Sequence, residues 1–436
     1  MRALFHTLGC KVNQYETQAM RRLMEQAGFE TGEYQPGQPD AGDAVIVVNS
    51  CTVTGESDRK LRQLLRRARR DNPRAVLVLT GCMPQAFPAV AEGYEEADIV
   101  LGNAQRRSLP RQVEAFLTCH QRIVDVSAHG AAFEPLSIED FEGRTRAFVK
   151  IEDGCNRFCS YCIIPYARGR VRSRALSELE QELRALGAHG YREVVLVGIN
   201  LTAFGRDTGH TLADAVDVAC RVPEIARVRL GSLEPDDMTP DLLTRLRAQP
   251  KLCPQFHLSL QSGCDATLAR MRRRYTAAEY ARTCAALREA FPGCALTTDV
   301  MVGFPGEDEA EFEASLRFVE SVGFAKAHVF AYSRRPGTPA ADAPRQVPQV
   351  EKVARSHRMI ALCDASRERY LRQQIGRTVP VLTETRLLGG GTGGYTDTYV
   401  PVRLSGAYPP GELIEAVVTD VSDGACLAEA ASVQPV

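Results

Sequence analysis

The stretch most informative about the fold is Asp153-Gly-Cys155-Asn-Arg-Phe-Cys159-Ser-Tyr161-Cys162, in a chain of 436 residues. Three thiolates at this spacing can each bind one iron of a [4Fe–4S] cluster, which normally takes four Cys ligands. The fourth iron then stays open to another ligand. A zinc site or buried thiols are the alternatives, but zinc needs a fourth Cys or His nearby, and residues 163–188 contain neither. We therefore predict that Cys155, Cys159 and Cys162 bind an incompletely ligated cluster.

Outward from this run, apolar strand patterns alternate with helical patterns. Strands are expected at 147–151, 193–197, 228–231, 256–260, 296–302 and 327–332. Helices are expected between them, for example at 176–189 and 310–322, and Ser177-x-x-Glu180 predicts a capping box at the first of these. Six such units indicate a partial, open TIM-like (β/α)6 barrel, whose chemistry lies in the loops after the strands. Cys155 follows the first strand at that end.

The first hundred residues repeat this alternation, with strands expected at 3–8, 44–48, 75–80 and 98–101. This pattern predicts an N-terminal open parallel α/β sheet. The first three strands run into Cys10, Cys51 and Cys82. A single Cys at a strand end is most often a packing residue, but the carboxyl ends of parallel strands converge on one edge. Three cysteines at equivalent ends therefore predict a second cluster site.

The C-terminal part changes character after a proline-rich connection at 336–348. An Arg-rich helix is expected at 349–374, followed by short strand patterns at 378–383, 399–403 and 413–420. These patterns are typical of a small β-barrel. We expect the whole chain to be an α/β protein with domains at 1–125, 141–366 and 367–433.

Composition indicates a globular, cytoplasmic protein. The chain is 44% hydrophobic and 25% charged, with a net charge of −1. It shows neither a signal-peptide pattern nor an apolar stretch of 18 residues, so no membrane partner is expected. In the reducing cytosol, clustered cysteines indicate metal rather than disulfides.

Positive charge is concentrated in two runs. Residues 60–74 carry seven Lys or Arg against one Asp, and residues 144–174 carry eight against two acids. The first run predicts either a phosphate track for nucleic acid or a solvated helix face. In the second run, four arginines are expected to face the substrate: Arg168, Arg170, Arg172 and Arg174.

The Cys155 motif resembles the signature of the radical S-adenosylmethionine (SAM) superfamily. The resemblance implies that the open iron chelates SAM and that Tyr161, just before the third Cys, lies against the adenine. It also implies that Gly198 and Asn200, after the second strand, contact the SAM amino group, although the usual Gly-Gly-Glu is missing. No catalytic residue is expected beyond the cluster ligands.

Three further polar residues follow the next strands of the series. Ser232 and Glu234 come after the third strand and Gln261 after the fourth, while Gly303-Phe-Pro-Gly306-Glu307 follows the fifth. Each of these motifs, taken alone, could be a structural turn. Because they share one end of successive strands, we predict that Ser232, Glu234 and Gln261 contact SAM or the substrate.

The complete arrangement resembles the methylthiotransferases over nearly the whole chain. The resemblance implies two [4Fe–4S] clusters, with SAM serving as both methyl donor and radical source. The runs 8–16, 49–54 and 158–169 resemble the type that converts N6-threonylcarbamoyladenosine at tRNA position 37 to its 2-methylthio derivative. The alternatives are the types that act on isopentenyladenosine of tRNA, with Gln-Met-Asn after the first Cys, or on an aspartate of a ribosomal protein, with Pro-Lys-Asn. This chain has Lys11-Val-Asn13.

The resemblance also implies partners. These are the tRNA anticodon loop and an electron donor such as flavodoxin or ferredoxin, with no role for DNA. The last domain resembles the RNA-associated TRAM module, but residues 376–430 carry seven acids and three Arg. A net negative barrel is a poor phosphate binder, so we expect RNA affinity to come from the other two domains. A non-enzymatic iron–sulfur RNA-binding protein is the remaining alternative, which two complete cysteine trios disfavour.

Overall fold

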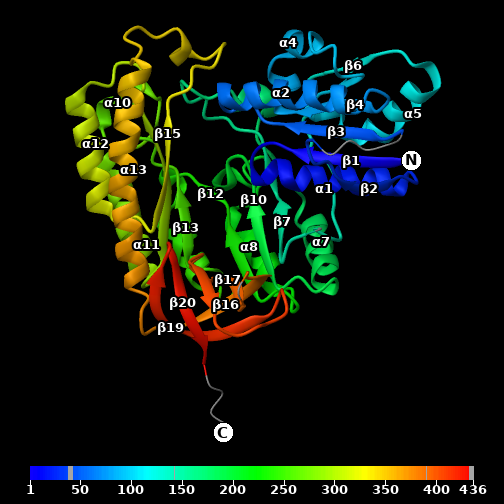
Figure 1. Cartoon of the computed structure of the whole chain (residues 1–436). Coiled ribbons are helices and arrows are strands. Elements are labelled where there is room, and N and C mark those ends of the chain that lie inside the picture. The colour runs from blue at the N-terminus through cyan, green and yellow to red at the C-terminus, as the bar shows by residue number, and fades with distance from the viewer. Residues whose placement is uncertain (38–42, 142, 389, 432–436) are drawn as a thin grey trace.

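The computed structural model describes residues 1–37, 43–141, 143–388 and 390–431. Figure 1 shows an α/β protein in three parts: an N-terminal sheet with helices at the upper right, a larger strand–helix series at the centre and left, and a small β-structure at the bottom. This agrees with the expected fold class. The last residues of the expected 367–433 domain lie outside the described residues.

The N-terminal sheet is parallel and has the strand order β2-β1-β3-β4-β5-β6. Its strands are β1 (Arg2–Thr7), β2 (Glu30–Glu33), β3 (Val45–Ser50), β4 (Val76–Gly81), β5 (Ile99–Leu101) and β6 (Ile123–Asp125). The two edge strands, β2 and β6, were not expected from the sequence, because they are short and lack a continuous apolar run. Strands β3 and β4 are buried along their whole length, as is typical of a parallel sheet covered on both faces.

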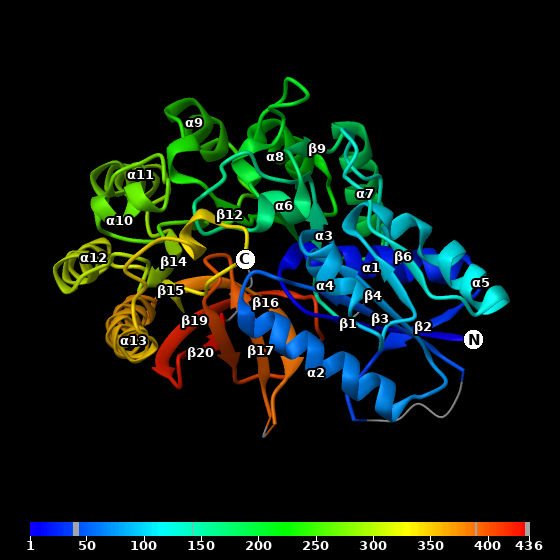
Figure 2. The same cartoon turned by 90° about the horizontal axis from the view of Figure 1, so that it is seen from above.

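Helices cover both faces of this sheet. They are α1 (Lys11–Gln26), α2 (Gly55–Asp71), α3 (Cys82–Ala86), α4 (Pro88–Glu92), the 3₁₀ helix η1 (Asn103–Ser108) and α5 (Leu109–Cys119). Leu61 and Leu65 of α2 pack on one face, and Met20 of α1 packs with Leu109 of α5 on the other. Figure 2 shows α2 on the outside of the sheet.

The central part is an open barrel. Its strands are β7 (Arg146–Lys150), β10 (Glu193–Val197), β11 (Arg227–Leu230), β12 (Ser232–Leu233), β13 (Gln255–Leu258), β14 (Ala295–Val302) and β15 (Lys326–Ala331). They pair as β11-β10-β7 and β12-β13-β14-β15, and only Gly231 separates β11 from β12. In the described sheets β7 does not pair with β15, so the barrel is open between these two edge strands.

Helices surround this barrel on the outside (Figure 2). They are α7 (Leu176–Ala188), α8 (Leu212–Arg221), α9 (Pro240–Arg247), α10 (Asp265–Arg270), α11 (Ala277–Ala290), α12 (Glu309–Val322) and α13 (Gln349–Arg372). Shorter elements are β8 (Glu152–Asp153), α6 (Ile164–Arg168), β9 (Arg172–Ser173), η2 (Leu201–Ala203), η3 (Pro235–Asp237) and η4 (Pro339–Ala341).

The capping box expected at Ser177 and Glu180 is wrong. Helix α7 has Ala175 as its N-cap, with no side-chain cap, so Ser177 already lies inside the first turn. Complete capping boxes are instead formed by Thr211 with Asp214 at α8 and by Thr276 with Glu279 at α11.

The C-terminal strands form a closed barrel in the order β16-β17-β18-β20-β19. They are β16 (Thr378–Arg386), β17 (Thr392–Thr396), β18 (Pro401–Leu404), β19 (Leu413–Ser422) and β20 (Ala425–Ala430). Strand β17 was not expected from the sequence, because Thr-Gly-Gly-Tyr-Thr contains two glycines, which are depleted in strands. Strand β20 was not expected either, because its Ala-rich sequence has weak strand propensity.

This C-terminal barrel closes the amino end of the central barrel. Arg227 donates to the Pro380 carbonyl at 2.5 Å, Arg229 donates to the Asp397 carbonyl at 2.7 Å, and Arg146 pairs with Glu384 at 2.6 Å. The buried carboxylate of Glu193 joins all three arginines. The central barrel is therefore covered at this end, and β7 and β15 are the two edge strands between which the described barrel stays open.

No helix in the described part of the chain combines the length and the apolar character that crossing a bilayer requires.

Candidate active site

The three N-terminal cysteines meet at the carboxyl edge of the sheet. Ser50 pairs with Gly81 across β3 and β4, which places Cys51 beside Cys82. A Cβ atom added to Gly9, just before Cys10, would lie 2.8 Å from the Cβ of Cys51. A Cβ on Gly81 would lie 2.4 Å from the Ser50 carbonyl oxygen. Both glycines have positive φ angles, so only glycine lets these segments approach so closely. The structure thus brings the segments that carry Cys10, Cys51 and Cys82 close together at this edge, and the role of the three thiols as metal ligands stays a prediction.

The thiols of this trio lie close enough to affect one another electrostatically. Burial raises the pKa of Cys51 to about 12, and the charges of Cys82 and Cys10 contribute to the rise. Burial likewise raises the pKa of Cys10. Neutral thiols are poor metal ligands, whereas a bound metal deprotonates a coordinating thiol outright. The donor set therefore fits a cationic metal centre that would hold all three cysteines as thiolates.

The second trio lies in the loop between β8 and α6. The Cys155 N–H donates to the Gly169 carbonyl at 3.0 Å, and the Cys162 N–H donates to the Cys159 carbonyl at 3.0 Å. Ser160, between them, donates its N–H to the Met271 carbonyl at 3.1 Å. These bonds fix the loop against the segment after α10. Burial raises the pKa of Cys162 to about 12 and that of Cys155 to about 11, and the Cys159 charge contributes to both.

The arrangement of these thiols differs from a mononuclear site. In the described part of the chain, no three His, Cys, Asp or Glu side chains are placed to hold one metal ion. A single zinc ion draws four ligands around one point, whereas in a cubane each thiolate binds a different iron. A [4Fe–4S] cluster at each trio stays a prediction.

Each trio has one buried arginine bonded to a sulfur atom. Arg168 of α6 donates from Nε to the Cys82 Sγ at 3.3 Å, and Arg273 donates from Nη1 to the Cys159 Sγ at 3.3 Å. Each arginine also pairs with a carboxylate, Glu16 for Arg168 and Glu234 for Arg273. A fixed cation that donates to sulfur stabilises a thiolate and the negative charge of a cluster.

Glu16 of α1 is the centre of a buried network between the N-terminal part and the barrel. Its carboxylate pairs with Arg168, with Arg106 at 3.0 Å and with Lys150 of β7 at 2.7 Å. Burial opposes ionisation of Glu16, but these cations outweigh it and lower its pKa to about 2. The network connects α1, which begins just after Cys10, to α6, which begins just after Cys162. It thereby fixes the two cysteine trios relative to each other.

Tyr161, Gly198 and Asn200 line the same end of the barrel. The Tyr161 ring packs edge-on against Phe304 after β14, with ring centroids 6.3 Å apart. A Cβ on Gly198 would lie 2.6 Å from the Glu152 Oε2, and the Asn200 N–H donates to the same oxygen at 2.8 Å. The side chain of Asn200 accepts a hydrogen bond from Thr202. Their SAM contacts stay predictions.

Ser232, Glu234 and Gln261 have different environments. Ser232 is exposed and pairs in register with His257, whereas the Glu234 carboxylate is bound by Arg273 and lies 3.8 Å from Arg157. Gln261 has φ +69°, an unusual left-handed backbone for a non-glycine residue. Its N–H and carbonyl both bond to β14, at Asp299 and Met301. Ser232 and Gln261 therefore lie at the strand ends, whereas the carboxylate of Glu234 pairs with the guanidinium of Arg273.

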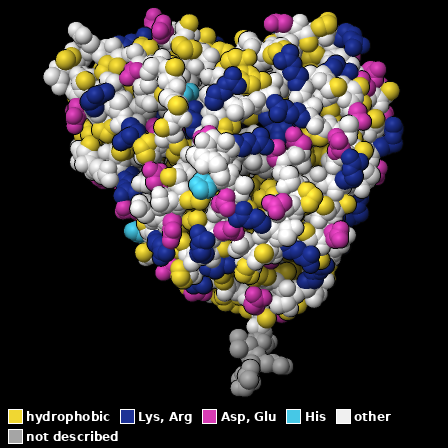
Figure 3. Space-filling model, turned by 180° about the vertical axis from the view of Figure 1, so that it is seen from behind, with side chains coloured by type: hydrophobic (Ala, Val, Ile, Leu, Met, Phe, Trp, Pro, Cys, Tyr) yellow, Lys and Arg dark blue, Asp and Glu magenta, His cyan; other side chains and the backbone are white. Residues whose placement is uncertain are grey.

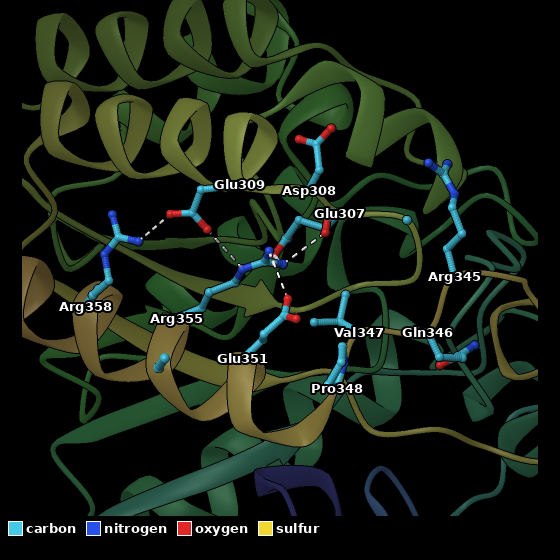
Figure 4. A pocket seen from close by; sticks show the side chains of 12 residues that line it. Glu307, Asp308, Glu309, Arg345, Gln346, Val347, Pro348, Glu351, Arg355 and Arg358 are labelled. Atoms are coloured by element: carbon cyan, nitrogen blue, oxygen red, sulfur yellow. Dashed lines mark hydrogen bonds and ion pairs between the residues drawn. The ribbon is translucent and has the colours of Figure 1, made fainter.

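The Gly303–Glu307 motif forms a structural turn with an outward-facing pocket of about 510 Å³ beside it. Glu307 accepts the Gly303 N–H at 2.8 Å and pairs with Arg355 of α13 at 3.0 Å. Figure 4 shows Arg355 among Glu307, Glu309 and Glu351, with Arg358 bound to Glu309. These charges satisfy one another, so the motif attaches α13 to the barrel.

Two residues of the site, Glu152 and Arg273, were not predicted from the sequence. Glu152 is fully buried beneath the 198–200 loop, and burial raises its pKa to about 8. Arg273 gave no signal, because its contacts to Cys159 and Glu234 span 114 and 39 residues. For Glu152, an acid directly before the cysteine loop was the available signal.

The expectation that four arginines after the cysteine loop face the substrate is wrong for three of them. Arg168, Arg172 and Arg174 are buried, and they pair with Glu16, Asp153 and Glu182 respectively. The sequence shows these three positive charges, but it does not show which acidic side chains pair with them in the fold. Only Arg170 is exposed, with its guanidinium 4.7 Å from the Phe158 ring centroid.

Basic side chains do line α2. Six of its positions are Lys or Arg that point outward, and several pair with nearby acids, for example Arg66 with Glu96. Arg62 is exposed and forms no ion pair with a described residue. Figure 3 shows the opposite face of the molecule, where basic and acidic side chains are interspersed. The surface of α2 thus remains a candidate for phosphate contacts.

Comparison with known proteins gives two family matches. Residues 149–319 match the Radical SAM superfamily, and residues 2–102 match a family described as Uncharacterized protein family UPF0004. Among solved structures, the radical S-adenosylmethionine methyltransferase TsrM from Kitasatospora setae has a TM-score of 0.59 at 14% identity, covering 78% of this chain and 75% of that one. At this identity the likeness supports the fold alone.

Relatives in sequence are closer. The threonylcarbamoyladenosine tRNA methylthiotransferase MtaB of Bacillus subtilis (strain 168) is 38% identical over 92% of this chain and 90% of its own length. The MtaB protein of Thermotoga maritima is 37% identical over the same shares. A tRNA-2-methylthio-N(6)-dimethylallyladenosine synthase of Moorella thermoacetica is 36% identical over 87% of this chain and 86% of its own length.

The open barrel with a three-cysteine loop at its carboxyl end defines a radical SAM enzyme. Such enzymes use SAM and a [4Fe–4S] cluster. The chain belongs to the MtaB family of methylthiotransferases, because both MtaB relatives match it over nearly their full length.

Proposed function

We propose that this enzyme converts N6-threonylcarbamoyladenosine at position 37 of tRNA to its 2-methylthio derivative. The observation that carries the proposal is the pairing of two cysteine trios through Arg168, which follows one trio in sequence and bonds to a sulfur of the other. A methylthiotransferase needs one centre for radical formation and one for sulfur delivery, at a single substrate. The relatives named for this nucleoside supply the substrate class.

In this proposal Cys155, Cys159 and Cys162 hold the radical-forming cluster, and Cys10, Cys51 and Cys82 hold an auxiliary one. When bound, the clusters and SAM supply radical chemistry, a methyl group and sulfur. The residues around them position these groups: Arg273 and Arg168 donate to the sulfurs, and Tyr161 packs beside Cys162 against Phe304. SAM would lie across the strand ends that carry Gly198, Asn200, Ser232 and Gln261.

The fold also supports a route by which the substrate would reach the site. Docking of the C-terminal barrel covers the amino end of the central barrel, and the N-terminal part lies over its carboxyl end (Figure 1). An anticodon-loop nucleotide would therefore enter through the opening between β7 and β15. The other sides of the barrel would keep water away from the site, which protects a reactive intermediate from side reactions.

Two alternatives concern the substrate. Relatives named for the dimethylallyl nucleoside also match this chain, at identities up to 36% among those given above. This chain has Lys11-Val-Asn13 after the first cysteine, whereas the type that acts on isopentenyladenosine has Gln-Met-Asn there.

The second alternative is a ribosomal-protein substrate, which the acidic C-terminal barrel would favour. One of the acids of that barrel, Glu384, pairs with Arg146 within the chain.

The partners follow from the same proposal. The tRNA would contact basic residues of α2 while its anticodon loop reaches the barrel opening. A small reduced electron donor, such as flavodoxin or ferredoxin, would supply the electron that radical formation requires.

The direct test is mass spectrometry of tRNA nucleosides from cells with and without the gene. Loss of the 2-methylthio form of N6-threonylcarbamoyladenosine, restored by the plasmid-borne gene, supports the proposal. Loss of the dimethylallyl derivative instead would reassign the substrate.

Cluster number is tested on purified protein with two variants. The wild type is expected to hold about eight irons per chain, and Cys51→Ala or Cys159→Ala about four. Cys159→Ala should abolish SAM cleavage, whereas Cys51→Ala should retain cleavage and lose methylthio transfer. Product formation by Cys51→Ala would contradict the auxiliary role of the N-terminal trio.

A further inference from the structure

The edge strand β15 presents an unusual face to the barrel opening. Ala327 and Val329 pack against the main hydrophobic core, which includes Met359 of α13. Because side chains alternate along a strand, Lys326, His328 and Phe330 point to the other side, into the barrel, and all three are exposed. We call these three residues the inner face of β15.

An aromatic ring is exposed on this inner face. Phe330 is 47% exposed although it is a large apolar residue. Two histidines follow it on the same face. The ring centroids of Phe330 and His328 are 6.4 Å apart, and those of His328 and His257 on β13 are 6.2 Å apart. Nucleobases stack on exposed aromatic side chains at single-stranded sites. The chain has no Trp, so such stacking falls to rings like Phe330.

A lysine lies on the other side of the same opening. Lys11 is the first residue of α1, directly after Cys10, and it is exposed. Its Nζ is 6.0 Å from the ring centroid of Phe148 on β7, the strand that borders the opening opposite β15. Lys11 therefore lies on the β7 side of the opening, and its charge adds to burial and to the charges of Lys326 and His257 in lowering the pKa of His328 on β15.

The positive charge at this opening lacks a carboxylate partner. Neither Lys11 nor Lys326 forms an ion pair with any described residue. Two acids lie nearby: Asp299 of β14 lies 3.4 Å from His257, and Glu193 binds three arginines at the barrel end. An unpaired ammonium across the opening from an exposed aromatic ring is complementary to a flat base that carries an anionic substituent.

We propose that Lys11 binds the free carboxylate of the amino-acid group on N6 of the substrate adenosine, while Phe330 stacks on its base. This inference rests on the proposed function, in which that N6 group is threonylcarbamoyl and therefore ends in a carboxylate. The dimethylallyl group of the related substrate is apolar, so an ammonium at residue 11 favours the first nucleoside over the second.

The test measures binding of anticodon stem-loop RNAs to the cluster-loaded full-length protein by fluorescence anisotropy. Four RNAs carry, at position 37, the threonylcarbamoyl nucleoside, its methyl ester, the dimethylallyl nucleoside or plain adenosine. The wild type is expected to bind the acid about tenfold more tightly than the ester, because a charge-assisted hydrogen bond is lost. Equal affinity for acid and ester would overturn the inference, and this comparison requires no variant.

Variants separate the two contacts. Lys11→Met should remove the preference for the acid over the ester, and Lys11→Arg should retain most of it. Phe330→Ala should weaken binding of all four RNAs by about tenfold, because stacking does not depend on the N6 group. Arg221→Gln, which removes an exposed arginine of α8 without a described ion pair, is the control for loss of one charge.

Other outcomes distinguish a failure of the role proposed for Lys11 from a failure of the proposed function. A Lys11→Met protein that keeps the full preference for the acid refutes the role of Lys11 while leaving the proposed function intact. Weaker SAM binding by Lys11→Met with unchanged RNA preference also refutes it, because Lys11 would then serve the cofactor. A wild type that forms no methylthio product from the threonylcarbamoyl RNA refutes the proposed function itself.

Discussion

The Nε of Arg168 lies 3.3 Å from the Sγ of Cys82, although the two residues belong to different parts of the fold. Arg168 ends α6, six residues after Cys162, so the segment that follows one cysteine trio donates to a sulfur of the other. The same guanidinium binds Asn13 and Glu16 of α1. One buried side chain thereby fixes the spacing of two candidate cluster sites, a requirement for any reaction that uses both.

The first prediction concerns this arginine. Arg168→Leu leaves Glu16 with fewer cations and Cys82 without its donor. Loss of one partner from a buried ion pair typically costs about 3–5 kcal/mol. We expect reduced stability in thermal unfolding and an iron content that falls from about eight toward about four per chain, through selective loss of the N-terminal cluster.

Arg170→Leu is the matched control for Arg168→Leu. Arg170 lies two residues further on, is exposed and stacks on Phe158. Its removal should leave iron content and unfolding temperature close to those of the wild type. Normal iron content in Arg168→Leu would show that the Cys82 contact is dispensable for cluster assembly.

The second prediction concerns the reduction potential of the barrel cluster. Arg273 donates to the Cys159 Sγ and carries a fixed positive charge, which favours the more negative, reduced cluster. Arg273→Leu should lower the potential by about 40 mV, the equivalent of about 1 kcal/mol for one electron. Potentiometric titration followed by electron paramagnetic resonance measures this shift.

The neighbouring Arg274 is exposed and provides the control. Arg274→Leu removes the same charge without a contact to sulfur, so its potential should stay near that of the wild type. Equal shifts in both variants would mean that general surface charge, rather than the Arg273 hydrogen bond, sets the potential.

The third prediction tests the close approach that brings the N-terminal trio together. Gly81 has φ +104°, and a Cβ atom there would lie 2.4 Å from the Ser50 carbonyl oxygen. Gly81→Ala must therefore shift β3 against β4 and separate Cys51 from Cys82. We expect destabilisation of about 3 kcal/mol and loss of iron from this site, measured by denaturant unfolding and iron assay.

Gly93→Ala serves for comparison. Gly93 ends α4 with φ −77°, and its nearest atom to an added Cβ is 3.4 Å away. Alanine fits there, so stability should change by less than about 1 kcal/mol. If both substitutions were equally harmless, the two strand ends would have more freedom than the structure indicates.

The fourth prediction concerns α2. Arg62 is exposed and has no ion pair with a described residue, so its guanidinium is available to a phosphate. Arg62→Gln should weaken binding of tRNA irrespective of the nucleoside at position 37. It should also reduce the slope of log K against log salt by about 1. Arg221 is the last residue of α8, and Figure 2 shows α8 on the side of the molecule away from α2. Arg221→Gln should leave the slope unchanged, and an equal effect of both substitutions would argue against α2 as the phosphate track.

The sequence was most informative where chemistry coincides with local pattern. Cys10, Cys51 and Cys82 directly follow apolar strand patterns, so the parallel-sheet rule predicts their convergence without any knowledge of distant contacts. Local spacing likewise predicted the barrel trio, and alternating apolar patterns predicted the six central strands. The short edge strands β2 and β6 escaped detection because no apolar run marks them.

Contacts between residues far apart in the chain could not be predicted from local sequence patterns. Arg168 was expected to face substrate, yet its partner Glu16 is 152 residues away in the chain. Arg227 and Arg229 bond to the C-terminal barrel more than 150 residues later in the chain, which no local pattern around them indicates. Such contacts depend on how the parts dock, which spacing within one element does not reveal.

The last prediction follows from that docking. Glu193 is buried among Arg146, Arg227 and Arg229 at the junction with the C-terminal barrel. Burial opposes its ionisation, but the charges of Arg229 and Arg146 outweigh burial and hold its pKa below the usual 4.5. A carboxyl with a depressed pKa in the folded state stabilises the protein above pH 4.5, and this contribution is lost as the pH falls below that value.

Glu193→Gln should therefore destabilise the protein at pH 7, by about 3 kcal/mol, because three buried arginines lose their shared anion. The difference from the wild type should shrink as the pH is lowered from 4.5, since the wild-type carboxyl then becomes protonated as well. Urea unfolding at pH 7 and pH 4 measures both quantities. Glu415→Gln, on β19 of the C-terminal barrel and without a described ion pair, controls for loss of one acid. A pH-independent difference between Glu193→Gln and the wild type would show that shape, not charge, governs the junction.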